Sequence, residues 1–192
     1  MNSDTIVHKV IVTSGNGLTK TYEITITRLT NNNQNNNTTN NNNQSISASI
    51  SNIISASSYV ANNEFLSNIS FGSGVSTLID NLKKYSATVS ITVKDKDNNS
   101  KTSGTIVTGD KVIISTGSEE KTFTVVLYGD TNGDGSISAI DLLNIQKIII
   151  NKSNLNGAFY KAADTNKDGK ISAIDLLNVQ KHILGKLIIS QN

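Results

Sequence analysis

Alternating apolar and polar positions predict two strands near the start of the chain. Residues 5–12 are rich in β-branched side chains, and in residues 18–27 Tyr22, Ile24 and Ile26 alternate with polar residues. Such patterns favour strands, and Gly15-Asn16-Gly17 between them supplies a hairpin turn. Because an isolated hairpin is only marginally stable in water, we expect residues 1–29 to be the C-terminal fragment of a β-sandwich domain.

A polar tract follows the hairpin. Residues 31–43 are asparagine, interrupted only by Gln34, Thr38 and Thr39. Such a tract has no apolar surface whose burial could offset the entropy lost on ordering, so we expect residues 30–44 to be an Asn-rich disordered linker. The alternative is prion-like assembly through asparagine ladders.

A second β-rich region extends from residue 45 to residue 128. Strand patterns recur at residues 66–71, 87–93, 105–107, 112–114 and 122–128. One helix is expected at residues 75–84, where Val75, Leu78, Ile79 and Leu82 share a face. We expect an immunoglobulin-like β module over residues 45–128, packed without a linker against the segment that follows.

The last third of the chain contains one segment written twice. Residues 130–151 return as residues 164–185, at a constant offset of 34 residues. Six positions differ between the copies: Gly133/Lys167, Ser136/Lys170, Ile145/Val179, Ile148/His182, Ile150/Leu184 and Asn151/Gly185. A repeat this close indicates one structural unit used twice.

Each copy carries oxygen donors at the spacing of a calcium loop. Ca²⁺ takes about six to eight oxygens, from loop positions 1, 3, 5, 7, 9 and 12, and glycine at position 6 permits the sharp bend. The alternative is a pair of Asp/Asn/Gly-rich turns without metal. The predicted ligands of two Ca²⁺ ions are Asp130, Asn132, Asp134, Ser136, Ser138, Asp141, Asp164, Asn166, Asp168, Lys170, Ser172 and Asp175, with Ser136 and Lys170 acting through backbone carbonyls.

A helix is expected after each loop, over residues 139–151 and 173–184, the second ended by Gly185. A short helix between the repeats is expected to cover the core with Leu155, Phe159 and Tyr160, and Ile137 is expected to pair with Ile171. The core residues predicted from helical spacing are Leu142, Ile145 and Ile149 with Leu176, Val179 and Ile183.

The repeats lack the entering helix of an ordinary EF-hand, because residues 123–128 are of strand type. This layout, aspartate at position 12 and the close duplication resemble type I dockerins, the docking modules of bacterial cellulosome-type assemblies. The resemblance covers residues 129–192. It implies a small all-α fold with two EF-hand-like calcium loop-helix repeats that binds a cohesin domain of a scaffoldin or partner protein.

The resemblance also implies a partner-binding surface at loop positions 10 and 11 and along the adjoining helix. An Ala-Ile pair stands where some dockerins have hydroxyl residues, which implies a cohesin with an apolar patch. The near-identity of the copies suggests docking in two orientations. The alternative for Leu143 and Leu177 is a wide buried helix face. The implied partner-binding residues are Ala139, Ile140, Leu143 and Lys147, with Ala173, Ile174, Leu177 and Lys181.

Two weaker resemblances concern the region before the repeats. The ending Tyr22-x-Ile24-x-Ile26-x-Arg28 is similar to the last strands of bacterial cadherin-like β-sandwich repeats. Residues 45–128 resemble the small β modules that often precede clostridial dockerins. The expected fold class is therefore multi-domain, with a β-rich, β-sandwich-like N-terminal part followed by the small all-α dockerin fold.

Composition narrows the function classes. A net charge of +2 with no basic cluster gives no nucleic-acid footprint, and no apolar run reaches the length of a membrane span. The acids Glu64, Asp80 and Asp110 are scattered, and neither His8 nor His182 lies in a catalytic pattern, so we expect no enzyme in these residues. There is no cysteine, and because the first residues lack a basic stretch followed by an apolar one, we expect no signal peptide at Met1. Because calcium loops suit extracellular ion concentrations, we expect the C-terminal part of a longer secreted or cell-surface protein.

The function expected from the sequence is non-catalytic, calcium-dependent docking that anchors a secreted, polysaccharide-degrading protein in a cellulosome-like or cell-surface complex. Two alternatives remain. The residues could be the C-terminal part of a glycoside hydrolase whose catalytic domain lies elsewhere, or part of a structural or adhesive surface protein.

Overall fold

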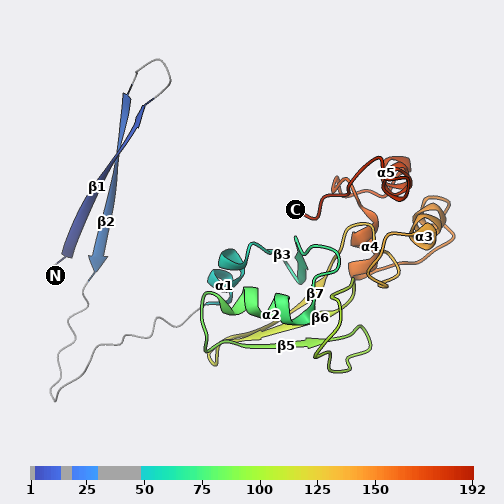
Figure 1. Ribbon diagram of the computed structural model, residues 1–192, viewed down its shortest axis with the longest axis horizontal. Coiled ribbons are helices and arrows are strands. Elements are labelled where there is room, and N and C mark those ends of the chain that lie inside the picture. The colour runs from blue at the N-terminus through green and yellow to red at the C-terminus, as the bar shows by residue number, and fades with distance from the viewer. Residues whose placement is uncertain (1–2, 14–18, 30–48) are drawn as a thin grey trace. The chain divides into compact units, whose positions relative to one another are not determined.

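The computed structural model describes residues 3–13, 19–29 and 49–192, and the chain separates into two compact units, residues 1–44 and 45–192 (Figure 1). In the first unit, β1 (Ser3–Thr13) and β2 (Thr19–Leu29) pair antiparallel, from Ser3 opposite Leu29 to Thr13 opposite Thr19. Lys9 Nζ and Glu23 Oε1 lie 3.0 Å apart across this pair. The two strands pair as the hairpin prediction requires. The turn between them and the predicted linker at 30–44 lie outside the described residues.

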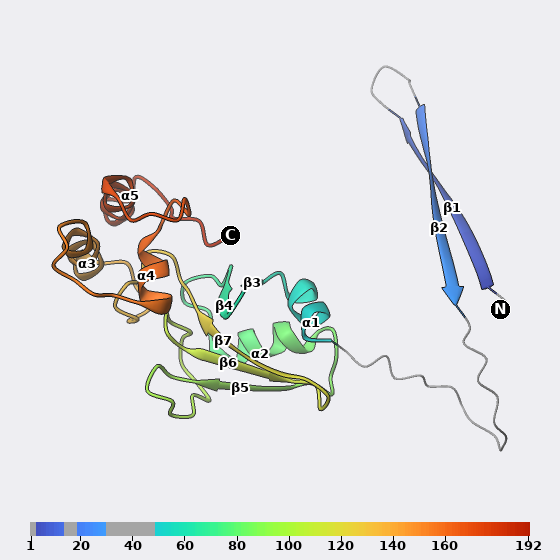
Figure 2. The same ribbon diagram turned by 180° about the vertical axis from the view of Figure 1, so that it is seen from behind.

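The second unit contains a mixed five-stranded sheet in the order β3-β4-β7-β6-β5. These strands are β3 (Val60–Asn62), β4 (Phe65–Ser67), β5 (Ser90–Lys94), β6 (Lys111–Ser115) and β7 (Glu120–Val125). Strand β4 runs parallel to β7, and the other pairs are antiparallel. Helices α1 (Ile50–Ser57) and α2 (Val75–Lys83) contact each other and pack on the sheet with a shared apolar core (Figures 1 and 2).

This architecture differs from the immunoglobulin-like module expected over residues 45–128, because helices, not a second sheet, cover the described sheet. The sequence pattern missed α1, in which Ile50, Ile53 and Ile54 recur at helical spacing within a serine-rich segment and are buried. The expected strand at 105–107 is reduced to one bridge between Thr105 and Gly74. The backbone around it instead bonds to the start of α2 and the residues just before it, where the Ile106 N–H donates to the Ser73 carbonyl and the Val75 N–H donates to the Gly104 carbonyl.

The C-terminal part contains three helices, α3 (Ala139–Ile149), α4 (Gly157–Ala163) and α5 (Ala173–Ile183) (Figure 1). Helices α3 and α5 contact each other, and Ile145 and Val179 are fully buried in their core. Ile137 and Ile171 both pack against this core, although no direct pairing between them is shown.

Two features of this core were predicted wrongly. Ile149 and Ile183 are 36% and 42% exposed, and Ile148 packs against the core in their place. In α5, His182 stands at the position of Ile148 and accepts a hydrogen bond from the Ile189 N–H at 3.4 Å. Helix α4 does not cover the core with the expected bulky residues. It uses the small buried side chains Ala158, Ala162 and Ala163, while Tyr160 is 43% exposed.

The sheet and the helical part meet without a linker, as expected. After β7, Val126 is buried in the core of the helical part, while the next residue, Leu127, is buried in the core of the β module. Two adjacent residues therefore fix the position of the first loop relative to the sheet.

None of the helices in residues 49–192 combines the length and the apolar character that a membrane span requires.

Candidate functional site

The first aspartate of each loop collects backbone amides from its own loop. Asp130 Oδ1 accepts from the N–H groups of Gly133 and Asp134 at 2.8 and 3.2 Å, and Oδ2 accepts from Gly135 at 3.2 Å. In the second loop, Asp164 accepts from Asp168 at 3.1 Å and Gly169 at 2.9 Å. These bonds wrap the loop backbone around the carboxylate.

Positions 3 and 5 form the same pair in both loops. Asn132 Nδ2 donates to Asp134 Oδ2 at 2.7 Å, and Asn166 Nδ2 donates to Asp168 Oδ2 at 2.8 Å. The other oxygen of Asp134 accepts from the amide and the hydroxyl of Ser136. Lys170 offers only its amide to Asp168, at 2.8 Å.

The aspartate at position 12 ties the start of each loop to the start of its helix. Asp141 Oδ1 accepts from the Thr131 N–H at 2.8 Å, and Oδ2 accepts from the Ser138 N–H at 2.8 Å. Asp175 does the same with Asn166 at 3.2 Å and Ser172 at 2.8 Å. Ser138 and Ser172 close capping boxes with these carboxylates, and both aspartates are fully buried. Each position-12 residue thus orders loop and helix together.

The carboxylates sit in different electrostatic environments. Burial raises the pKa of Asp130 above its usual value, against the opposing effect of the amides that bond to it. The Ser136 hydroxyl lowers the pKa of Asp134, and the Asn166 side-chain amide lowers the pKa of Asp168. The aspartate at position 5 is therefore readily ionised at the surface. Ionisation of the buried Asp130 carries a desolvation cost, which a bound cation would offset.

The donor set fits a hard cation. Every predicted ligand offers oxygen from a carboxylate, amide, hydroxyl or backbone carbonyl, which are the donors that Ca²⁺ prefers. Among the described residues, no three Asp, Glu, His or Cys side chains form a metal cluster by themselves. A bound ion would therefore also need the amide, hydroxyl and carbonyl oxygens of each loop.

Two of the six differences between the copies preserve one backbone conformation. Gly133 and Lys167 both adopt positive φ, at 74° and 62°, and so do Asn151 and Gly185, at 54° and 67°. The conformation is the same, but the space differs. A Cβ on Gly133 would lie 2.6 Å from the Thr108 carbonyl oxygen, so this position cannot take lysine without movement.

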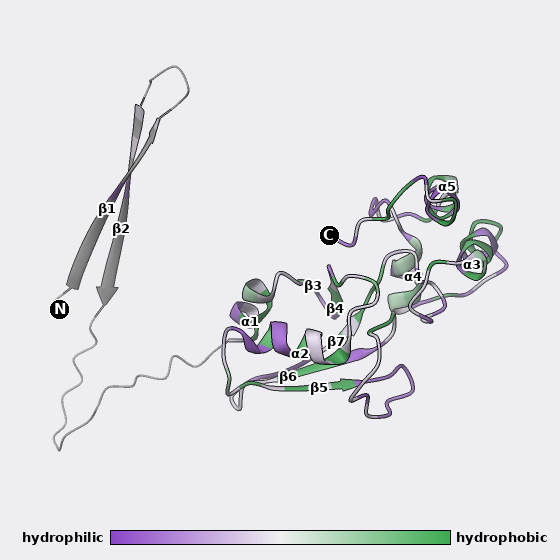
Figure 3. Cartoon of the chain, in the orientation of Figure 1, coloured by the Kyte–Doolittle hydropathy of each residue, from purple (hydrophilic) through white to green (hydrophobic). Residues whose placement is uncertain are grey.

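The eight predicted partner-binding residues, four in each copy of the repeat, are all exposed. Ile140 and Ile174 are each 55% exposed, and Leu143 and Leu177 are 46% and 45% exposed. The alternative of a wide buried face for the two leucines is therefore wrong. Green, apolar residues run along both helices in Figure 3.

Sequence reasoning missed one extension of this surface. Ile150 and Leu184, just after α3 and α5, are 57% and 59% exposed. They continue the helical spacing of Ile140, Leu143 and Lys147, which was the available signal. We call the ten residues the repeat face: Ala139, Ile140, Leu143, Lys147 and Ile150, with Ala173, Ile174, Leu177, Lys181 and Leu184.

Asp110, one of the scattered acids, has a structural role. It is buried, and its Oδ2 accepts from Lys101 Nζ at 2.6 Å and from the Val107 N–H at 2.9 Å. These contacts fix the turn that begins at Val107.

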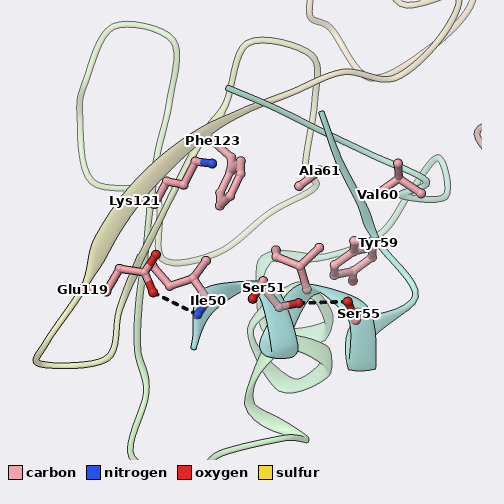
Figure 4. Close-up of a pocket in the computed structure, with 10 residues that line it drawn as sticks. Ile50, Ser51, Ser55, Tyr59, Val60, Ala61, Glu119, Lys121 and Phe123 are labelled. Carbon is pink, nitrogen blue, oxygen red and sulfur yellow. Dashed lines mark hydrogen bonds between the residues drawn. The ribbon is translucent and has the colours of Figure 1, made fainter. Parts of the chain in front are cut away.

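A hollow of about 390 Å³ lies between α1, β3 and β7 (Figure 4). Lys121 reaches over the ring of Phe123 there, at 4.9 Å from its centroid. The carboxylate of Glu119 accepts from the Ile50 N–H at 3.2 Å, so it holds the start of α1.

Residues 128–184 match the family model of the dockerin type I domain. The search of curated proteins gave no match, and neither did the search of solved structures. The matched segment contains both loops, α3, α4 and α5.

Proposed function

Since residues 128–184 match the family model of the dockerin type I domain, we propose that this chain docks, in a calcium-dependent way, onto a cohesin domain of a partner protein. The observation that carries the proposal is the repeat face, which presents matching apolar residues at nearly equal exposure on both copies. A cohesin on a scaffoldin or on another surface protein is the proposed partner.

Two Ca²⁺ ions are the proposed cofactors, one in each loop. The first would be held by Asp130, Asn132, Asp134, Ser138, Asp141 and the carbonyl of Ser136, and the second by Asp164, Asn166, Asp168, Ser172, Asp175 and the carbonyl of Lys170. When bound, the ion neutralises the carboxylates that repel one another in each loop. Because Asp141 and Asp175 also cap α3 and α5, we infer that an ordered loop fixes the helices of the repeat face.

The two copies would give the partner two equivalent ways to bind. The aliphatic residues of the repeat face would anchor the contact, and Lys147 and Lys181 would lie at its rim. Rotation by half a turn would exchange α3 and α5 while presenting the same side chains.

Docking would anchor a secreted, polysaccharide-degrading protein in a cellulosome-like or cell-surface complex. The alternatives are the C-terminal part of a glycoside hydrolase and part of an adhesive surface protein. We expect no glycan hydrolysis by the chain itself. The domains encoded together with these residues distinguish the two alternatives.

Binding to a panel of purified cohesin domains tests the proposal, with calcium and with excess chelator. We expect submicromolar binding that the chelator abolishes. Replacing Ile140 and Leu143 by serine should weaken binding only about twofold, since one orientation remains. The same change in both copies should weaken it at least about a hundredfold, because two apolar anchors are lost in each orientation.

The matched control is Ile188→Ser, because Ile188 is 86% exposed and lies outside the repeat face. This change should leave binding unaltered. Binding that survives the change in both copies would place the docking surface elsewhere. Complete loss from the change in one copy would exclude two orientations while leaving docking itself in place.

A further inference from the structure

We propose that the β module completes the first calcium loop, which makes the two sites unequal and lets only the first transmit calcium binding to the sheet. This inference rests on the proposed calcium binding. The residue that carries it is Thr108, which belongs to the β module and lies 22 positions before Asp130 in the chain.

Thr108 bonds directly to the first aspartate of the first loop. Its backbone N–H donates to Asp130 Oδ2 at 3.1 Å, and both residues are buried. Within the described part of the chain, the carboxylate of Asp164 accepts hydrogen bonds only from its own loop, from Asp168 and Gly169. One carboxylate is thus oriented from outside its loop, and its counterpart is not.

The backbone of the first loop lies against the β module. A Cβ on Gly133 would meet the Thr108 carbonyl oxygen at 2.6 Å and the Phe159 ring at 2.9 Å, and one on Gly135 would meet Val107 at 2.8 Å. In the second loop, a Cβ on Gly169 would meet nothing within 4 Å, and Lys167 already carries a side chain. The glycines of the first loop are therefore closely packed against neighbouring residues, whereas Gly169 of the second loop is not.

The sheet sets the position of Thr108 independently of the loop. Thr108 Oγ1 accepts from the Leu127 N–H at 3.0 Å and donates to its carbonyl at 3.3 Å. The next residue, Gly109, donates its N–H to the Val125 carbonyl at 3.0 Å. The pair of Asp110 with Lys101 holds the other end of the turn. Thr108 is therefore a positioning residue, held by its hydrogen bonds to Leu127 and by the bond of Gly109 to Val125.

Preorganisation predicts the direction of the asymmetry. A loop that is already held in place loses less conformational freedom when it closes around an ion, so the first site should bind calcium more tightly. An ion that binds only the ordered loop also stabilises whatever orders that loop. Calcium in the first site should therefore protect the turn at residues 105–110 and strands β6 and β7, whereas calcium in the second site should not.

The sharpest test transfers the residue of the second copy to the first. The repeat itself shows that position 4 accepts lysine at positive φ, since Lys167 has it. Gly133→Lys in the full chain should lower the calcium affinity of the first site at least about tenfold, because the new side chain collides with Thr108 and Phe159. The reverse change, Lys167→Gly, removes the contacts of Lys167 with the Tyr128 ring and the Asn192 carbonyl but none with the turn at residues 105–110, so the second site should change less than the first. Calorimetric titration with calcium measures both.

Hydrogen exchange provides a readout in the β module. In the unchanged chain, calcium should slow exchange at residues 105–115, and Gly133→Lys should remove that protection. Thr108→Val is the milder variant, since it keeps the shape but removes the hydroxyl contacts to Leu127. It should weaken the first site roughly three- to tenfold and leave the second unchanged.

The outcomes separate the two proposals. No calcium binding at either site would overturn the proposed function itself. Binding at two sites of equal affinity, unaltered by Thr108→Val and without protection at residues 105–115, would overturn this inference alone. Should Gly133→Lys unfold the chain, the Thr108→Val titration decides.

Discussion

At the scale of single residues, each loop is organised by its first and its last aspartate. Asp130 and Asp164 gather loop amides, and Asp141 and Asp175 join the loop to the following helix. The two loops share these bonds but not their surroundings. Asp130 is fully buried, whereas Asp134 lies at the surface with its charge stabilised by Ser136.

We predict that Asp130 titrates at higher pH than Asp134 in the calcium-free chain. Burial raises the pKa of Asp130, so the stability that its protonated form contributes is present at low pH and is lost as the pH rises through its folded-state pKa. The pKa of Asp134 is lowered, so its small contribution is present at higher pH and is lost as the pH falls through its folded-state pKa. Carboxyl ¹³C NMR titration measures both groups, and the reverse order of the two pKa values would contradict the burial argument.

At the scale of elements, the two repeat helices end in the same way despite different residues. The N–H groups of Asn151 and Lys152 donate to Ile148 and Lys147, and those of Gly185 and Lys186 donate to His182 and Lys181. This pattern requires positive φ at the second residue after the helix, which glycine adopts freely and asparagine tolerates. The Asn151/Gly185 difference therefore conserves one helix end.

Substitutions at these helix ends should follow backbone conformation. Gly185→Ala should lower the free energy of unfolding by about 1 kcal/mol, because alanine is strained at positive φ. Asn151→Gly should leave it within about 0.5 kcal/mol. Thermal unfolding in saturating calcium measures both changes, and an unchanged Gly185→Ala protein would mean that this end does not constrain the helix.

The sequence predicted elements well where the periodicity was strong. The duplicated segment located α3 and α5, and the stripe of Val75, Leu78 and Leu82 located α2. Pattern alone missed α1, because its serines obscure the helical period, and it could not show the parallel pairing of β4 with β7. Pairing between strands that are distant in sequence leaves no local signal. The sequence therefore predicted a sandwich where the structure has one sheet covered by helices.

The candidate site was predictable in part for the same reason. Loop spacing identified the oxygen donors and helical spacing the exposed stripe, but neither pattern pointed to Thr108. That residue lies in a turn without a motif, and the fold brings it to Asp130.

At the scale of the second unit, the C-terminal tail also joins the helical part to the β module. The Gln191 side chain accepts from the Tyr128 N–H at 2.7 Å and donates to the Tyr128 carbonyl at 3.0 Å. The Gln191 carbonyl accepts from the Asn68 N–H at 2.9 Å. The tail therefore bonds to the junction that connects sheet and loop.

Gln191→Ala should lower the free energy of unfolding of this unit by about 1–3 kcal/mol, because two partly buried backbone groups of Tyr128 lose their partner. Gln191→Glu keeps an acceptor for the Tyr128 N–H but places a carboxylate oxygen against the Tyr128 carbonyl, so it should also destabilise the unit. Urea unfolding compares the two variants. Equal stability of all three chains would show that the tail adds nothing to the junction.

The most direct test of the central claim is calcium titration of the chelator-stripped chain, by calorimetry with far-ultraviolet circular dichroism on the same sample. A helical part of this size has little core of its own, and each ion should add roughly 2.7 kcal/mol when free calcium is 100-fold above Kd. We predict uptake of two ions per chain, a gain of helical signal, and its loss in excess chelator. A chain that takes up no calcium, with a spectrum that chelator leaves unchanged, would contradict the account.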